Sequence, residues 1–128
     1  MGIVLMLNGL HGLVRFLILL AAIVGLIKAV MSLAQGSATD KFDRMLASAF
    51  VGTYDLQMLL GILIIFLGGL LQAIHPIIMF VGIVTAHGLQ RMTRRAEGQQ
   101  ARIYQLLLFI VPLAIILIGL ASIGHLPT

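Results

Sequence analysis

Four long apolar runs, separated by two polar segments and one tight turn, make up most of the chain. The runs cover about residues 3–30, 45–71, 73–91 and 103–123, and the third is only just long enough to cross a membrane. A helix needs about 20 residues to span roughly 30 Å of hydrocarbon, whereas lone strands leave backbone groups unsatisfied in lipid. The pattern predicts an all-α fold, a four-transmembrane-helix up-down bundle forming a single integral membrane domain over residues 1–128.

The three connections carry different local signals. In the first polar segment, Asp40 is a predicted N-cap for a helix that begins near Lys41. Between the second and third runs, the glycine pair at 68–69 precedes His75 and Pro76. Proline suits the first turn of a helix, so His75 is the predicted N-cap of the third helix.

Composition removes several classes of protein. The chain is 61% hydrophobic and 9% charged, whereas soluble domains carry about 25% charged residues. There are no cysteines, which excludes disulfides, iron–sulfur clusters, thiolate zinc sites and covalently attached c-type haem. The net charge of +4 arises from a few loop residues rather than a basic face, so no nucleic-acid partner is expected.

The basic residues predict an orientation. Seven of the eight lysines and arginines flank segments 31–44 and 90–102. Basic loops stay in the cytoplasm, so these two segments are predicted to be cytoplasmic in a bacterial inner membrane, with both termini on the outer, periplasmic side. The seven residues are Lys28, Lys41, Arg44, Arg91, Arg94, Arg95 and Arg102. No lysine or arginine precedes the first run, so we expect it to be a span rather than a cleaved signal peptide.

The remaining basic residue, Arg15, lies inside an apolar run, as does Asp55. A charge at the centre of a membrane helix costs at least about 2.5–3.5 kcal/mol. Counting from the basic edge at about 1.5 Å per residue places Arg15 about 20 Å and Asp55 about 16 Å deep. We therefore expect the two to pair. The pair either locks two helices together, or Arg15 binds an anionic group such as a haem propionate or quinone headgroup, with Asp55 as its counter-ion.

Two histidines share a second level. His11 and His75 lie about 25 Å and about 24 Å from the basic edge. Two neutral imidazoles on parallel helices can bind haem iron axially, and a b-type haem needs only such ligands and an apolar slot. The alternatives are that His11 is an interhelical hydrogen-bonding residue and His75 a helix cap. His87 is predicted to lie on another face, near the cytoplasmic edge.

Several short segments resemble a family of small four-helix bacterial membrane proteins labelled cytochrome b-like. They are Leu10–Phe16, Lys41–Asp43, Leu56–Gly61, and His75 with Met79. The resemblance covers the first three runs and implies a haem held by histidines, which fall here on His11 and His75.

Three functional hypotheses follow. The first is a b-type cytochrome-like electron-transfer subunit with one haem b near the outer face, which exchanges electrons with a quinone or a partner complex. The second is a non-catalytic accessory subunit of a larger respiratory or photosynthetic complex. The third is a small proton-linked transporter that uses Arg15 and Asp55. In each case the expected partners are the lipid bilayer and either other membrane subunits or further copies of the chain, and an independent enzyme is not favoured.

Overall fold

The computed structural model describes residues 2–37, 40–67 and 74–122, and these form four helices. They are α1 (Gly2–Gln35), α2 (Lys41–Phe66), α3 (Ile74–Arg95) and α4 (Gly98–Ser122). The all-helical prediction is confirmed, and α2 begins at Lys41 as the Asp40 cap predicts, although α1 extends past residue 30 and α4 begins before residue 103. α3 begins at Ile74, which places His75 inside the first turn rather than at the N-cap. The glycine pair at 68–69 lies outside the described residues.

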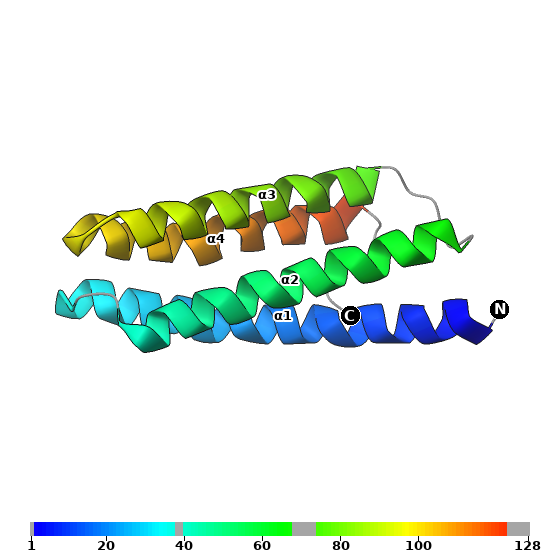
Figure 1. The fold of residues 1–128 in the computed structure, drawn as a ribbon, viewed down its shortest axis with the longest axis horizontal. Coiled ribbons are helices and arrows are strands. Elements are labelled where there is room, and N and C mark those ends of the chain that lie inside the picture. The colour runs from blue at the N-terminus through cyan, green and yellow to red at the C-terminus, as the bar shows by residue number, and fades with distance from the viewer. Residues whose placement is uncertain (1, 38–39, 68–73, 123–128) are drawn as a thin grey trace.

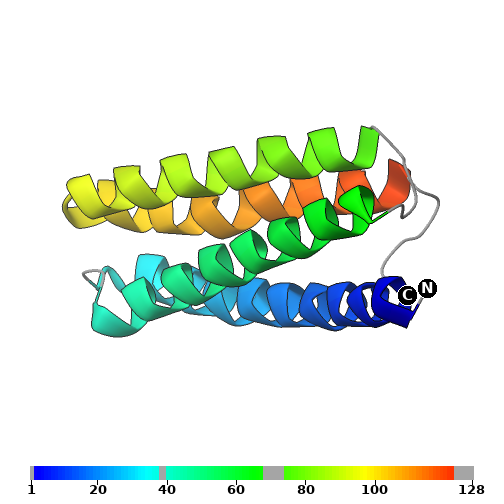
Figure 2. The same ribbon diagram turned by 45° about the vertical axis from the view of Figure 1, so that its right-hand side comes forward.

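The helices lie side by side along their length, and successive helices run in opposite directions (Figure 1). α1 packs against α2 and α4, while α3 packs against α4 and α2. The α1–α2 pair and the α3–α4 pair therefore form two layers, which a second view also shows (Figure 2). In this arrangement α1 and α3 run parallel on diagonal corners of the bundle.

Buried aromatic side chains hold the two layers together. The Phe50 ring of α2 packs against two other rings. The centroid of Tyr54, also in α2, is 6.2 Å away, and the centroid of Phe109 in α4 is 5.3 Å away. Gly25 of α1 lies directly against the Phe109 ring, leaving no room there for a side chain. Gly82 of α3 meets the Tyr54 hydroxyl in the same way. Small residues that permit close helix approach are a feature of membrane bundles.

Three helices in the described part of the chain are long and apolar enough to cross a membrane, namely α1, α2 and α4. The outward face of α1 carries large apolar side chains along its whole length, as expected for contact with lipid. α3 is not among the three. Its role as a fourth span stays a prediction.

Candidate functional site

A cavity of about 230 Å³ lies among the four helices. Its walls come from the first half of α1, the second half of α2, the start of α3 and the end of α4. It therefore lies in the half of the bundle away from the basic loops. Most of the lining is apolar, and the polar side chains that reach it are Asn8, His11, Arg15, Tyr54, Gln57 and His75. We call this the His11–His75 cavity.

The structure brings His11 and His75 to one cavity from diagonal helices, α1 and α3. Their predicted common depth is consistent with this placement. The Nδ1 atom of His75 lies 3.1 Å from the carbonyl oxygen of Gly119 on α4. A carbonyl oxygen only accepts, so Nδ1 carries the proton and donates.

His11 is held at its backbone rather than at its ring. The Gln57 side-chain amide donates to the His11 carbonyl oxygen at 2.8 Å, and the His11 ring lies over Gly61 of α2. Within the described residues, the buried Nδ1 of His11 and the buried Oε1 of Gln57 have no hydrogen-bond partner. Buried polar atoms are usually satisfied, so these two atoms make the His11–His75 cavity the candidate site.

Tyr54 and Met79 also line the cavity. The Tyr54 hydroxyl donates to the Met79 carbonyl oxygen at 2.8 Å and lies 3.8 Å from the Met79 sulfur. This bond ties α2 to α3 beside the cavity. The contact between Tyr54 and Gly82 indicates that this glycine serves helix packing.

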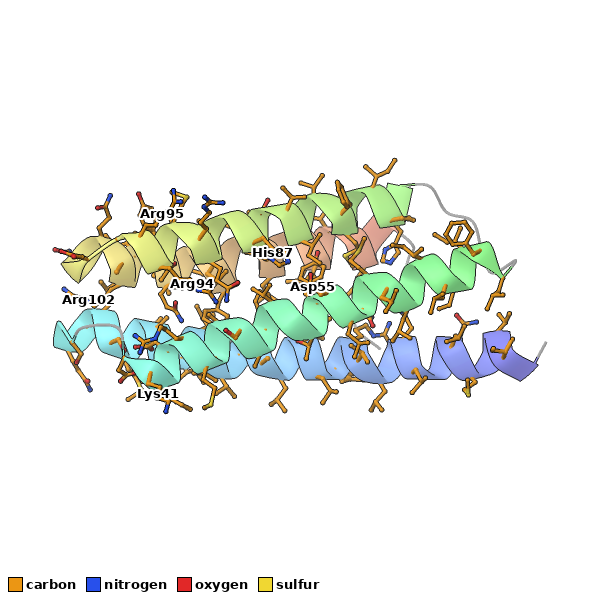
Figure 3. The ribbon with its side chains drawn as sticks, viewed as in Figure 1. Lys41, Asp55, His87, Arg94, Arg95 and Arg102 are labelled. Carbon is orange, nitrogen blue, oxygen red and sulfur yellow. The ribbon has the colours of Figure 1, made fainter. Side chains whose placement is uncertain are left out.

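The expected pairing of Arg15 with Asp55 is wrong. Asp55 is hydrogen-bonded to His87 of α3, with Oδ1 and Nε2 2.8 Å apart. The two side chains point toward each other across the seam between α2 and α3, about midway along the bundle (Figure 3). Arg15 lines the His11–His75 cavity instead, and Asp55 does not. His87 is therefore not at the edge, where the sequence placed it.

Sequence reasoning also missed a polar network at the other end of the bundle. The Lys28 ammonium donates to Asp43 at 3.0 Å, to Ser32 at 2.9 Å and to Asp40 at 3.4 Å. Asp43 is only 1% exposed. The spacing of Asp40 and Asp43, three residues apart before an apolar run, is the sequence signal that could have revealed this site.

The predicted N-cap of α2 is confirmed. Asp40 is the N-cap of α2, and its side chain accepts from the Asp43 backbone N–H while the Asp43 side chain accepts from the Asp40 backbone N–H, both at 2.9 Å. The hydrogen bond from the Asp43 backbone, with the nearby Lys28 ammonium, lowers the pKa of the Asp40 carboxyl below its ordinary value of 3.8.

Comparison of the chain with protein-family models, curated proteins and solved structures found no match. The class of protein is therefore defined by the fold alone: an all-helical bundle with three helices long and apolar enough to cross a membrane, and a largely apolar cavity in one half.

Proposed function

We propose that the chain is an electron-transfer subunit of a bacterial inner membrane, and that its redox cofactor binds in the His11–His75 cavity. The observation that carries the proposal is the meeting of two imidazoles from diagonal helices at one cavity. The orientation that accompanies it places the basic loops in the cytoplasm and the cavity in the outer half of the membrane.

Haem b is the cofactor that the candidate ligands, His11 and His75, fit best. Ligating histidines almost always donate their other ring N–H to a carbonyl, a carboxylate or water, and His75 does so to Gly119. The His11 ring has a buried nitrogen with no partner within the described residues. Haem supplies one-electron chemistry at its iron, and here His11 and His75 would hold it while Arg15 would face its propionates.

The volume of the His11–His75 cavity limits how haem can bind. About 230 Å³ is less than the roughly 300–1,000 Å³ of typical ligand sites, so the walls have to move apart around a macrocycle. Met58 and Met79 line the cavity, and unbranched thioether side chains rearrange at low cost.

The test is the pigment of the purified protein. We expect a Soret band and a reduced-minus-oxidised α-band that are lost in His11→Ala and His75→Ala. His87→Ala is the matched control, because it removes an imidazole that lies outside the cavity, and its spectrum should match the wild type. Protein without haem, together with normal assembly of both cavity variants, would overturn the assignment of haem.

A quinone headgroup is the second candidate, and the cavity size favours it. About 230 Å³ accommodates a single ring with its tail between helices, and Arg15 and Asn8 can donate to quinone oxygens. We expect a quinone to co-purify with the haem-free protein and to be depleted in Arg15→Gln. Lipid extracts in which the wild type and Arg15→Gln carry equal quinone would exclude it.

A further inference from the structure

The hydrogen-bonded pair of Asp55 and His87 lies on the outer surface of the bundle, away from the cavity. The side chains are 48% and 53% exposed, and they occupy the face where α2 and α3 meet, midway between the ends (Figure 3). Large apolar residues surround the pair on the same helices, with Leu56, Leu59 and Val84 all exposed. A half-exposed titratable pair therefore lies among exposed apolar side chains, with the polar side chains of Gln90 and Arg91 beside His87 toward the basic end.

Contact with lipid hydrocarbon is energetically unfavourable for such a pair. Ionisable residues at membrane depth almost always face protein or a water-filled cavity, because lipid tails cannot solvate them. The bond between Asp55 and His87 satisfies one oxygen and one ring nitrogen, and the exposed remainder of both side chains still requires polar contacts. This surface therefore needs a protein cover.

Small residues beside the pair allow another helix to come close. On α2, Ser48, Gly52 and Asp55 follow each other at four- and three-residue spacing and so share a face. On α3, Gly88 adjoins His87. A Cβ atom added to Gly52 or to Gly88 meets no atom within 4 Å, so both glycines face open space and neither serves packing within the bundle. Small residues of this kind let membrane helices approach at backbone distance.

We infer that this surface, the Asp55–His87 face (Ser48, Gly52, Asp55, His87 and Gly88), is an interface with a second copy of the chain. Each copy presents one carboxylate acceptor and one imidazole donor, so the face is complementary to itself. A two-fold axis places the same patch on both sides, and brings Asp55 of each copy toward His87 of the other. The inference does not depend on which cofactor the cavity binds.

The chain has no cysteine, so single-cysteine cross-linking in native membranes tests this directly. We expect Gly52→Cys to form a disulfide-linked band at twice the monomer mass on oxidation. Gly9→Cys is the matched control, because Gly9 is an exposed glycine of α1 that likewise has no atom near a built Cβ, and it should stay monomeric. Subunit counting in lipid nanodiscs should give two copies for the wild type.

A second variant measures the strength of the interface. Gly52→Leu should raise the dissociation constant of the dimer at least tenfold, while Gly9→Leu leaves it unchanged. Single copies in nanodiscs together with no cross-link at Gly52 would overturn the inference, as would equal cross-linking at Gly9. A cross-linked band of any other mass would assign the face to a different membrane subunit.

Discussion

Tyr54 and Asp55 are neighbours in sequence with opposite surroundings. Successive residues of a helix point about 100° apart, so Tyr54 faces the cavity and α3 while Asp55 turns outward to His87. Tyr54 is 1% exposed, and its hydroxyl has a backbone partner. The rotation between these two successive residues of α2 therefore places the cavity and the Asp55–His87 face on different sides of the helix.

At the residue scale, Gly82→Ala should destabilise the bundle. The new methyl group would collide with the Tyr54 hydroxyl and press on Ile115, and inserting a carbon into a packed core costs about 1–3 kcal/mol. Thermal unfolding in detergent, followed by circular dichroism, measures the change. Gly9→Ala is the control, because its methyl group meets no other atom. Equal unfolding temperatures for the two variants would contradict the packing role of Gly82.

At the element scale, the α1–α2 connection is stabilised by its polar network. The Asp43 carboxylate is almost fully buried and depends on the Lys28 ammonium. The capping box fixes the start of α2 at the same place. The connection therefore sets the register between α1 and α2, and with it the level at which Gln57 reaches the His11 carbonyl.

Lys28→Met should leave the Asp43 charge buried without its cation. Breaking a buried ion pair costs about 3–5 kcal/mol, and we expect about 3 kcal/mol because the Lys28 side chain is 23% exposed. Adding Asp43→Asn to Lys28→Met removes the charge and should recover most of the loss. Denaturant unfolding of the wild type, the two single variants and the double variant measures the coupling free energy between Lys28 and Asp43. Additive effects would mean that the two residues act independently.

The same connection should weaken in acid. The pKa of Asp40 is lower in the folded chain than its ordinary value of 3.8, so folding favours the ionised carboxylate. The stabilising effect is then present above pH 4 and is lost as the pH falls through the lowered pKa. Stability measured from pH 6 down to pH 2 should fall less steeply in Asp40→Asn than in the wild type. Identical slopes would show that Asp40 does not contribute.

At the scale of the whole molecule, the basic residues gather at one end of the bundle. Lys41, Arg94, Arg95 and Arg102 lie together at the end opposite the N-terminus (Figure 3). Arg102 also donates to the Ser37 backbone carbonyl at 3.0 Å and so links the start of α4 to the segment after α1 at that end. This asymmetry supports the proposed orientation.

Cysteine labelling tests that orientation and the fourth span together. We expect Ser37→Cys and Gln99→Cys to react only from the cytoplasmic side, and Phe66→Cys, at the other end of α2, only from the outside. Accessibility to a membrane-impermeant maleimide in intact cells and in inverted vesicles measures this. If Ser37 and Gln99 label from opposite sides, α3 does not span the membrane.

Much of the fold and part of the site follow from one-dimensional features. Apolar length predicts the helices, Asp40 marks the start of α2, and the clustering of cations along the chain predicts one basic end. Counting residues along each helix placed His11 and His75 at one level, and both line the same cavity. These features depend only on distance along the helix axis. That distance follows from the residue count, because the rise per residue is constant.

The rotation of the helices relative to one another was decided only by tertiary packing. Arg15 and Asp55 share a depth by residue count, yet Arg15 lines the cavity and Asp55 binds His87. Periodicity gives the faces of a single helix, but the neighbour that each face meets depends on how side chains such as Phe109 and Tyr54 fit against Gly25 and Gly82. The sequence alone determined a helical membrane protein with Arg15 and Asp55 inside its apolar runs. Packing decided which of those charges meet.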